Sequence, residues 1–92
     1  MKYIKKPVMI EAIQFVDDNL KPMIEAWGAP FAHAVLEQEA GLNSNIVLST
    51  LEGAYLVKQG DWIIKGVKGE FYPCKPDVFA LTYEPAEAGE EK

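Results

Sequence analysis

The sequence predicts an α+β domain in which a small antiparallel β-sheet, with its strands in meander order, packs with one or two short helices. Short runs of β-branched and aromatic residues recur every eight to nine residues in the second half of the chain, separated by glycine-containing turns. Nearer the start, an apolar stripe with helical spacing follows Asn19. From these runs we expect four to six strands.

The first expected strand covers residues 8–15, with the sequence VMIEAIQF. Pro7 precedes this run and suits the start of a strand. Successive side chains of a strand point to opposite faces, and here both faces are largely apolar. The run therefore predicts a strand in the interior of the sheet.

A short helix is expected next, at about residues 19–27. The run Asp17-Asp18-Asn19 offers side chains that cap helix N-termini, and Gly28 suits the C-terminal end. Pro22 is tolerated only in the first turn, so it fixes the start of the helix to the residues just before it.

The remaining elements follow from further runs of strand-forming residues. Strands are expected at residues 31–36, 46–50, 54–58, 62–65 and 70–73, with turns at 51–53, 59–61 and 66–69. A closing helix is expected to begin at Pro76, with Asp77 near its positive end. Its apolar side would be formed by Val78, Phe79, Leu81 and Tyr83.

The chain of 92 residues is long enough for one domain, which we place at residues 1–83. Residues 84–92 are rich in glutamate, have no apolar periodicity and are expected to form an acidic, disordered tail. The net charge is −5 and all nine basic residues are lysine. The absence of arginine, which makes the bidentate contacts to bases and phosphates, argues against nucleic acid as a partner.

The expected setting is the cytoplasm. No apolar run approaches the roughly 20 residues that span a bilayer, and the opening MKYIKKP leads into no hydrophobic secretory segment, so we expect no membrane partner. The single cysteine cannot form an intramolecular disulfide.

Residues that could carry chemistry are few. His33 is the only histidine, and it is expected on a strand at the surface or edge of the sheet. Cys74 precedes Lys75, and Lys65 and Lys68 would lie near it if the hairpin forms; lysines lower a thiol pKa, although most lone cysteines are packing residues. One cysteine and one histidine cannot provide a zinc site within one chain, so no metal is expected. No cofactor is expected either.

The stretch GDWIIKGVKGEFYPCKPDVF, residues 60–79, concentrates the candidate site residues. Strand alternation sends two of its aromatic residues to opposite faces, so one of them should be exposed beside lysines. The binding candidates are Lys65, Lys68, Phe71, Tyr72, Cys74 and Lys75.

Other residues of the same stretch are expected to be structural. Three glycines should adopt positive φ in turns, one aspartate should cap a turn through its side chain, and two aromatic side chains should be buried. These structural residues are Gly60, Asp61, Trp62, Gly66, Gly69, Pro76 and Phe79.

The composition favours a homodimer over a monomer. The chain is 49% apolar although its expected folded part is short, and the first strand is apolar on both faces. A second subunit would bury such surface.

Two segments, KKPVMIEAIQF near the start and GDWIIKGVKGEFYPCKPDVF near the end, resemble those of a family of small phage and prophage proteins of unknown function. The resemblance implies a phage or prophage origin and a bacterial host cytoplasm. The family brings no catalytic residues. It implies nothing further about mechanism.

Three functions are weighed on this basis. The favoured one is a non-enzymatic accessory protein, a binding module that acts on a host or phage macromolecule, such as a protein. The alternative is a protein that binds or sequesters a small molecule, either a nucleotide or a metabolite. An enzyme that uses Cys74 is the least favoured, so we expect no enzymatic activity.

Overall fold

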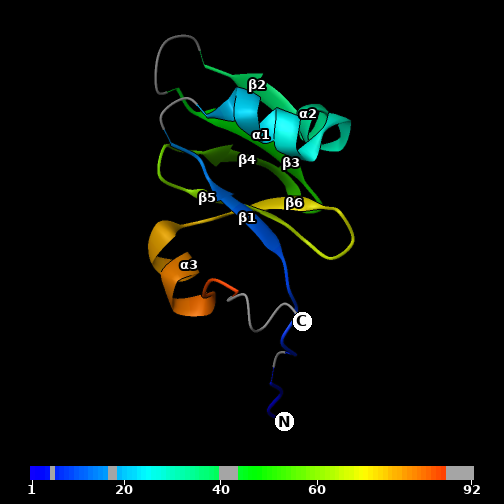
Figure 1. Ribbon diagram of the computed structural model, residues 1–92, viewed down its shortest axis with the longest axis vertical. Coiled ribbons are helices and arrows are strands. Elements are labelled where there is room, and N and C mark those ends of the chain that lie inside the picture. Colours follow the sequence, from blue (N-terminus) through cyan, green and yellow to red (C-terminus); the bar gives the residue numbers. More distant parts are fainter. Residues whose placement is uncertain (5, 17–18, 40–43, 87–92) are drawn as a thin grey trace.

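The computed structural model describes residues 1–4, 6–16, 19–39 and 44–86, which contain six strands and three short helices (Figure 1). The elements are β1 (Glu11–Gln14), α1 (Leu20–Trp27), α2 (Ala29–Ala34), β2 (Val35–Gln38), β3 (Ile46–Thr50), β4 (Gly53–Val57), β5 (Trp62–Lys65), β6 (Phe71–Cys74) and α3 (Pro76–Thr82). Every strand pairing is antiparallel, and the predicted α+β fold is confirmed.

The strands are divided between two three-stranded sheets, with the orders β1-β5-β6 and β2-β3-β4. The division occurs at the turn between β4 and β5. There the Phe15 N–H donates to the Asp61 carbonyl oxygen (2.8 Å), and the Gly60 N–H donates to the Phe15 carbonyl oxygen (2.7 Å). These bonds draw the chain toward β1, so β5 pairs with β1 and β6 and leaves the sheet of β4.

One apolar core connects both sheets with α1 and α2. Its centre is an aromatic group in which the rings of Trp27, Phe31 and Phe71 lie 5.1 to 5.3 Å apart. Edge-to-face and tilted contacts at such distances are favourable. The buried members of this core are Phe15, Leu20, Met23, Trp27, Phe31, Ile46, Leu48, Val57, Ile63 and Phe71.

Helix α1 confirms the expected helix. Leu20, Met23 and Trp27 are buried on one face, and Gly28, with φ of 75°, ends the helix with its N–H donating to the Ile24 carbonyl oxygen. Asn19 occupies the N-cap position as expected, but its side chain does not cap the helix. It accepts a hydrogen bond from the Val16 N–H and donates one to the Gln14 carbonyl oxygen instead. Asp17 and Asp18 lie outside the described residues. No helix among the described residues is long and apolar enough to cross a membrane.

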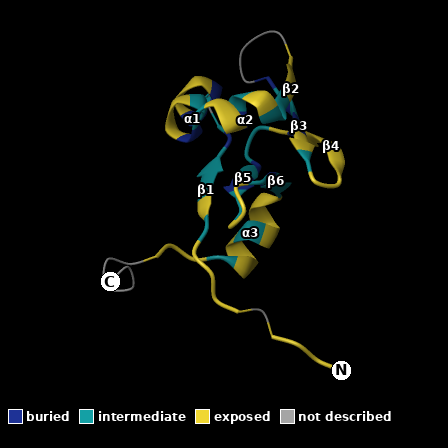
Figure 2. Cartoon of the chain, turned by 90° about the vertical axis from the view of Figure 1, so that its right-hand side faces the viewer, coloured by how far each residue is buried: buried dark blue, intermediate teal, exposed yellow. Residues whose placement is uncertain are grey.

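The first strand is shorter than predicted and lies at an edge. β1 pairs only with β5, so it is not an interior strand. Residues 1–4 and 6–10 have no strand partner. Residues 1–4 extend away from the body of the protein (Figures 1 and 2). Edge or interior position depends on pairing with distant residues, which local composition does not record.

The predicted strand at residues 31–36 is also wrong. The chain forms α2 up to Ala34, and β2 begins at Val35. Gly28 serves both as the end of α1 and as the N-cap of α2, and Pro30 lies in the first turn of α2. Alanine favours the helix and proline is tolerated in its first turn. His33 is consequently an exposed helix residue and not a strand residue.

The remaining elements agree with the prediction within one or two residues. The hairpin of β3 and β4, strand β5, the hairpin to β6 and the helix from Pro76 all occur. Residues 87–92 of the predicted acidic tail lie outside the described residues.

Candidate functional site

The β5–β6 hairpin arranges the predicted site residues on two faces. Its register places Tyr72 opposite Ile64 and Phe71 opposite Lys65. Phe71 is buried in the core, whereas Tyr72 lies half-buried on the other face. The predicted separation of the two rings is therefore confirmed, and Tyr72 is the accessible one of the pair.

Helix α3 covers the face of the sheet that carries Tyr72. The rings of Trp62 and Phe79 stack at 4.0 Å with an interplanar angle of 5°, and Tyr83 lies 5.1 Å from Phe79. Burial of Tyr72, followed by its hydrogen bond with Tyr83, raises the pKa of Tyr72 to about 12. Its phenol is therefore neutral throughout the physiological range.

The expected burial of Trp62 and Phe79 is wrong. Both side chains are half-buried, and no residue of α3 is buried. The reason is that α3 is a single short helix with only the sheet on its inner side (Figure 2). Replacing Trp62 by alanine should accordingly cost less than the ~3–5 kcal/mol typical of a fully buried aromatic residue.

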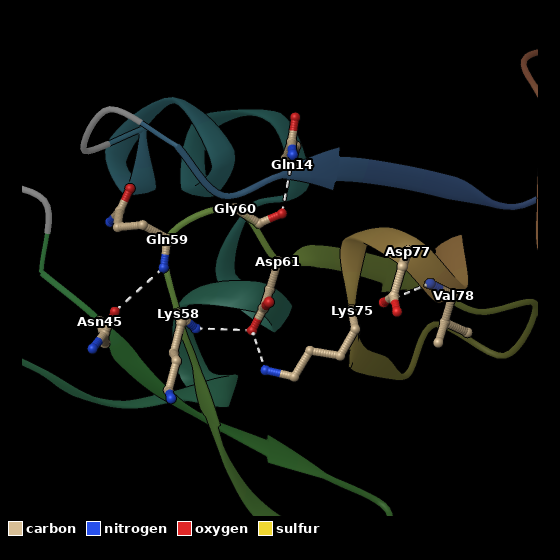
Figure 3. Close-up of polar contacts among 9 residues, drawn as sticks. All are labelled: Gln14, Asn45, Lys58, Gln59, Gly60, Asp61, Lys75, Asp77 and Val78. Atoms are coloured by element: carbon tan, nitrogen blue, oxygen red, sulfur yellow. Dashed lines mark hydrogen bonds and ion pairs between the residues drawn. The ribbon is translucent and has the colours of Figure 1, made fainter. Parts of the chain in front are cut away.

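Asp61 forms the most buried polar contact of the predicted stretch. Its side chain is only 6% exposed. Its Oδ2 accepts a hydrogen bond from the Lys58 N–H (3.0 Å) and forms an ion pair with the Lys75 ammonium (3.2 Å) (Figure 3). The expected turn cap is present, but it binds the amide three residues earlier and not one that follows. Asp61 thus fastens the β4–β5 turn to the start of α3, which is a structural role.

The glycines of the stretch divide into two kinds. Gly60 and Gly69 have positive φ, of 97° and 84°, as predicted. The prediction is wrong for Gly66, which does not have positive φ. A Cβ at Gly66 would lie 2.5 Å from a carboxylate oxygen of Glu70, so the Glu70 side chain would have to shift.

The three candidate lysines do not form one patch. Lys65 lies at one end of β5, next to the exposed turn with Lys68. Lys75 follows Cys74, which pairs with Trp62 at the other end of the strand, about 10 Å away along the sheet. Lys75 is also held by Asp61. Their role in recognition stays a prediction.

Cys74 has the surroundings of an unreactive thiol. Partial burial, and then the nearby carboxylates of Asp77 and Asp61, raise the pKa of Cys74. This direction is opposite to the one expected from neighbouring lysines, because the hairpin register leaves Lys65 and Lys68 at its far end. His33 is on α2, which lies at the opposite end of the molecule from α3, so no Cys–His pair forms (Figure 1). Among the described residues, no three potential metal ligands cluster together.

A groove opens where the two sheets meet, and it includes both predicted and unpredicted residues. We call it the inter-sheet groove; its volume is about 460 Å³. One wall is the tip of the β3–β4 hairpin and the other is the start of β6. Its lining consists of Thr50, Leu51, Glu52, Tyr55, Glu70, Phe71, Tyr72 and Pro73.

The hairpin wall of this groove was missed by the sequence analysis. Leu51 is 82% exposed, and Tyr55 is 43% exposed. The one signal in the sequence is a leucine at the first position of a predicted turn, where polar residues are usual. Nothing in the sequence indicated that this turn would meet β6.

A second hollow, the α3 cleft, lies between residues 7–10 and helix α3. Its volume is about 610 Å³, and its walls include Val8, Met9, Trp62, Phe79 and Tyr83. Its aromatic wall is the Trp62–Phe79 stack described above. Each aromatic residue of β5, β6 and α3 lines one of the two hollows.

Comparisons with protein-family models, with curated proteins and with solved structures give no match. No relative therefore transfers a role to any residue of this chain.

Proposed function

We propose that the protein is a non-enzymatic binding module that holds an extended segment of a partner protein in the inter-sheet groove. The observation that carries this proposal is the combination of Leu51, Tyr55 and Tyr72 in one open groove between two sheets. Tyr55 and Tyr72 are on the strands β4 and β6, and Leu51 is in the turn between β3 and β4. Exposed apolar clusters of this kind are typical of interaction sites.

The charges of the groove favour a basic segment. Glu52 and Glu70 lie on its two walls, and no lysine lines it. The ion pair found among the described residues, between Lys75 and Asp61, involves neither glutamate. A segment with apolar residues and one or two lysines or arginines would complement this surface and the net charge of −5.

The resemblance to small phage and prophage proteins supports an accessory role in the cytoplasm of a bacterial host. The closing motif coincides with the Gly60 turn, the buried Asp61, the β5–β6 hairpin and the start of α3. These residues supply the β6 wall of the groove. The resemblance therefore concerns both the scaffold and one side of the proposed site.

A random-peptide library tests the proposal even though the partner is unidentified. Selection on the full chain should enrich peptides that combine apolar residues with lysine or arginine. Their affinity should fall about tenfold or more in Leu51→Asp, which places a charge in the groove. Leu36→Asp is the matched control, because Leu36 is exposed on β2 and outside the groove.

If the library yields no enriched peptide, the proposal fails. It also fails if the selected peptides bind Leu51→Asp as tightly as the parent protein.

The α3 cleft favours the second candidate function, the binding of a nucleotide or a metabolite. Its volume lies within the range of about 300–1,000 Å³ usual for small-molecule sites, and aromatic side chains line it. A bound ligand would raise the melting temperature in a thermal-shift panel. The rise should disappear in Phe79→Ala.

A further inference from the structure

The free edge of β4 is a second surface on which this protein could act. β4 is the outermost strand of the β2-β3-β4 sheet, and no other described strand pairs with its outer side. Its register with β3 is unbroken over five residue pairs, from Thr50–Gly53 to Ile46–Val57. Figure 2 shows the β3–β4 hairpin at the exposed side of the molecule.

The other three edge strands carry features that oppose pairing with another chain. β6 contains Pro73, which lacks an N–H donor. β2 has a bulge between Val35 and Glu37, and its sequence includes a charge. β1 begins at the charged Glu11. Such features are the usual protection of sheet edges.

β4 has none of these protections. Its sequence, Gly-Ala-Tyr-Leu-Val, contains no charge and no proline, and its register has no bulge. Tyr55 and Leu56, on opposite faces of the strand, are 43% and 47% exposed. A neighbouring strand would cover apolar side chains on both faces while it pairs with the backbone.

We propose that β4 pairs antiparallel with β4 of a second copy of this chain about a two-fold axis, so that two β2-β3-β4 sheets become one six-stranded sheet. The axis passes at Tyr55, which lies opposite Tyr55 of the second copy. Ala54 then lies opposite Leu56 of the second copy. A two-fold axis makes each such contact occur twice.

Charge complementarity selects a second copy as the occupant. Glu52 and Lys58 flank β4 at its two ends, and both are exposed. The register centred on Tyr55 sets Glu52 opposite Lys58 of the second copy, once at each end. Figure 3 shows the Lys58 side chain pointing away from Asp61. The contact between these two residues is the hydrogen bond from the backbone N–H of Lys58 to the Asp61 carboxylate. An opposite-charge pair is therefore made at both ends, with no like charges opposed.

This pairing does not depend on the proposed groove function. Tyr55 and Glu52 also line the groove, whereas Leu51 and Glu70 lie outside the paired edge. Peptide binding is therefore judged on Leu51→Asp, and dimer formation on variants of β4 and its flanks.

The first test is the mass of the full chain in solution by sedimentation equilibrium, over about 1–200 μM protein. The mass should rise with concentration toward twice 10.2 kDa. Tyr55→Lys places two ammonium groups opposite each other at the axis and should raise the dimer Kd about tenfold or more. Leu36→Lys, a change at an exposed residue of the β2 edge, should leave the Kd unchanged.

A charge exchange tests the register with changes outside the strand, where the fold is least affected. Glu52→Lys and Lys58→Glu should each raise the dimer Kd about threefold or more, because each opposes like charges twice. The double variant restores opposite charges and should return the Kd to within about twofold of the parent. Far-ultraviolet circular dichroism should confirm that every variant is folded.

A mass of 10.2 kDa at every concentration would overturn the proposal. A dimer whose Kd is the same in Tyr55→Lys would do so too, and a double variant as weak as the single variants would overturn the register.

Discussion

At the residue scale, Asp61 and Lys75 show how this protein uses a buried charge. The carboxylate of Asp61 accepts a hydrogen bond from the Lys58 N–H and an ion pair from the Lys75 ammonium. The lysine side chain is 58% exposed, so water weakens the ion pair. The hydrogen bond from the Lys58 N–H is the more important contact, because without the Asp61 carboxylate this N–H would have no partner in the turn.

We expect Asp61→Ala to lower the free energy of unfolding by about 1–3 kcal/mol, because it leaves the Lys58 N–H without a partner. Asp61→Asn keeps an acceptor oxygen and should cost less. Lys75→Ala should cost below about 1 kcal/mol. Urea unfolding of the three variants measures these differences. A larger loss in Lys75→Ala than in Asp61→Ala would mean that the ion pair, and not the hydrogen bond, supports the turn.

The second residue-scale prediction concerns Cys74, whose pKa is raised by burial and by the carboxylates of Asp77 and Asp61. Iodoacetamide should alkylate Cys74 more slowly in the folded chain than in urea. In the folded chain, the alkylation rate plotted against pH should have its midpoint above the ordinary thiol pKa of 9.0. The folded chain favours the neutral thiol, so the protonated Cys74 contributes to the free energy of unfolding. This contribution is complete below pH 9.0 and is lost as the pH rises through the pKa of Cys74 in the folded chain.

Asp77→Asn removes one of the two carboxylates and should lower the pH at the midpoint of Cys74 alkylation. A folded-state midpoint below that of the unfolded chain would revive the hypothesis of a reactive cysteine.

At the element scale, the two hairpins and α1 were predictable because their signals are local. Glycine turns separate short apolar runs, and Leu20, Met23 and Trp27 share a helical face. The residues 31–36 were mistaken for a strand because apolar residues alternate there, whereas Gly28 and Pro30 determine a helix. Local signals do not state how the strands are shared between two sheets.

The candidate site was predictable to a similar extent. Strand alternation separates Phe71 from Tyr72 whatever the surrounding fold. The opposite wall, with Leu51 and Tyr55, comes from a hairpin far from β6 in the sequence. Only the packing of β3 against β6 brings these walls together.

The turn between β5 and β6 offers a prediction at this scale. Gly66→Ala should be destabilising because the new Cβ meets the carboxylate of Glu70, which also accepts a hydrogen bond from the Lys68 N–H. A side-chain end can move, so Glu70→Ala should reduce the cost of Gly66→Ala in a double-mutant cycle. Gly60→Ala meets no neighbouring atom but is strained by its φ of 97°, and Glu70→Ala should not relieve it.

Thermal unfolding of these single and double variants measures the coupling. Equal costs of Gly66→Ala with and without Glu70→Ala would show that space beside the carboxylate is not the reason for Gly66.

At the scale of the whole molecule, the surfaces are distributed around one core. The inter-sheet groove and the α3 cleft lie beside the β5–β6 hairpin, and the free edge of β4 lies on the other sheet. The homodimer expected from the composition stays a prediction. The structure offers a different reason for it, since Ile13 of the first strand packs against the core and the unprotected edge is β4.

Recognition by the lysines and recognition by the acidic groove predict opposite changes in peptide affinity for one variant. Changing Lys65, Lys68 and Lys75 together to alanine removes three positive charges from a protein of net charge −5. If a basic segment binds in the groove, its affinity should stay equal or rise, most visibly at low salt. Weaker binding with reduced salt dependence would instead place recognition on the lysines. Titration calorimetry at two salt concentrations distinguishes these results.

Amide chemical-shift mapping with a selected peptide tests the groove most directly, because it locates binding on the intact chain. The shifts that follow the added peptide should be largest at residues 50–55 and 70–72, and Leu51→Asp should abolish them. Shifts confined to the walls of the α3 cleft or to the turn with Lys68 would contradict binding in the groove.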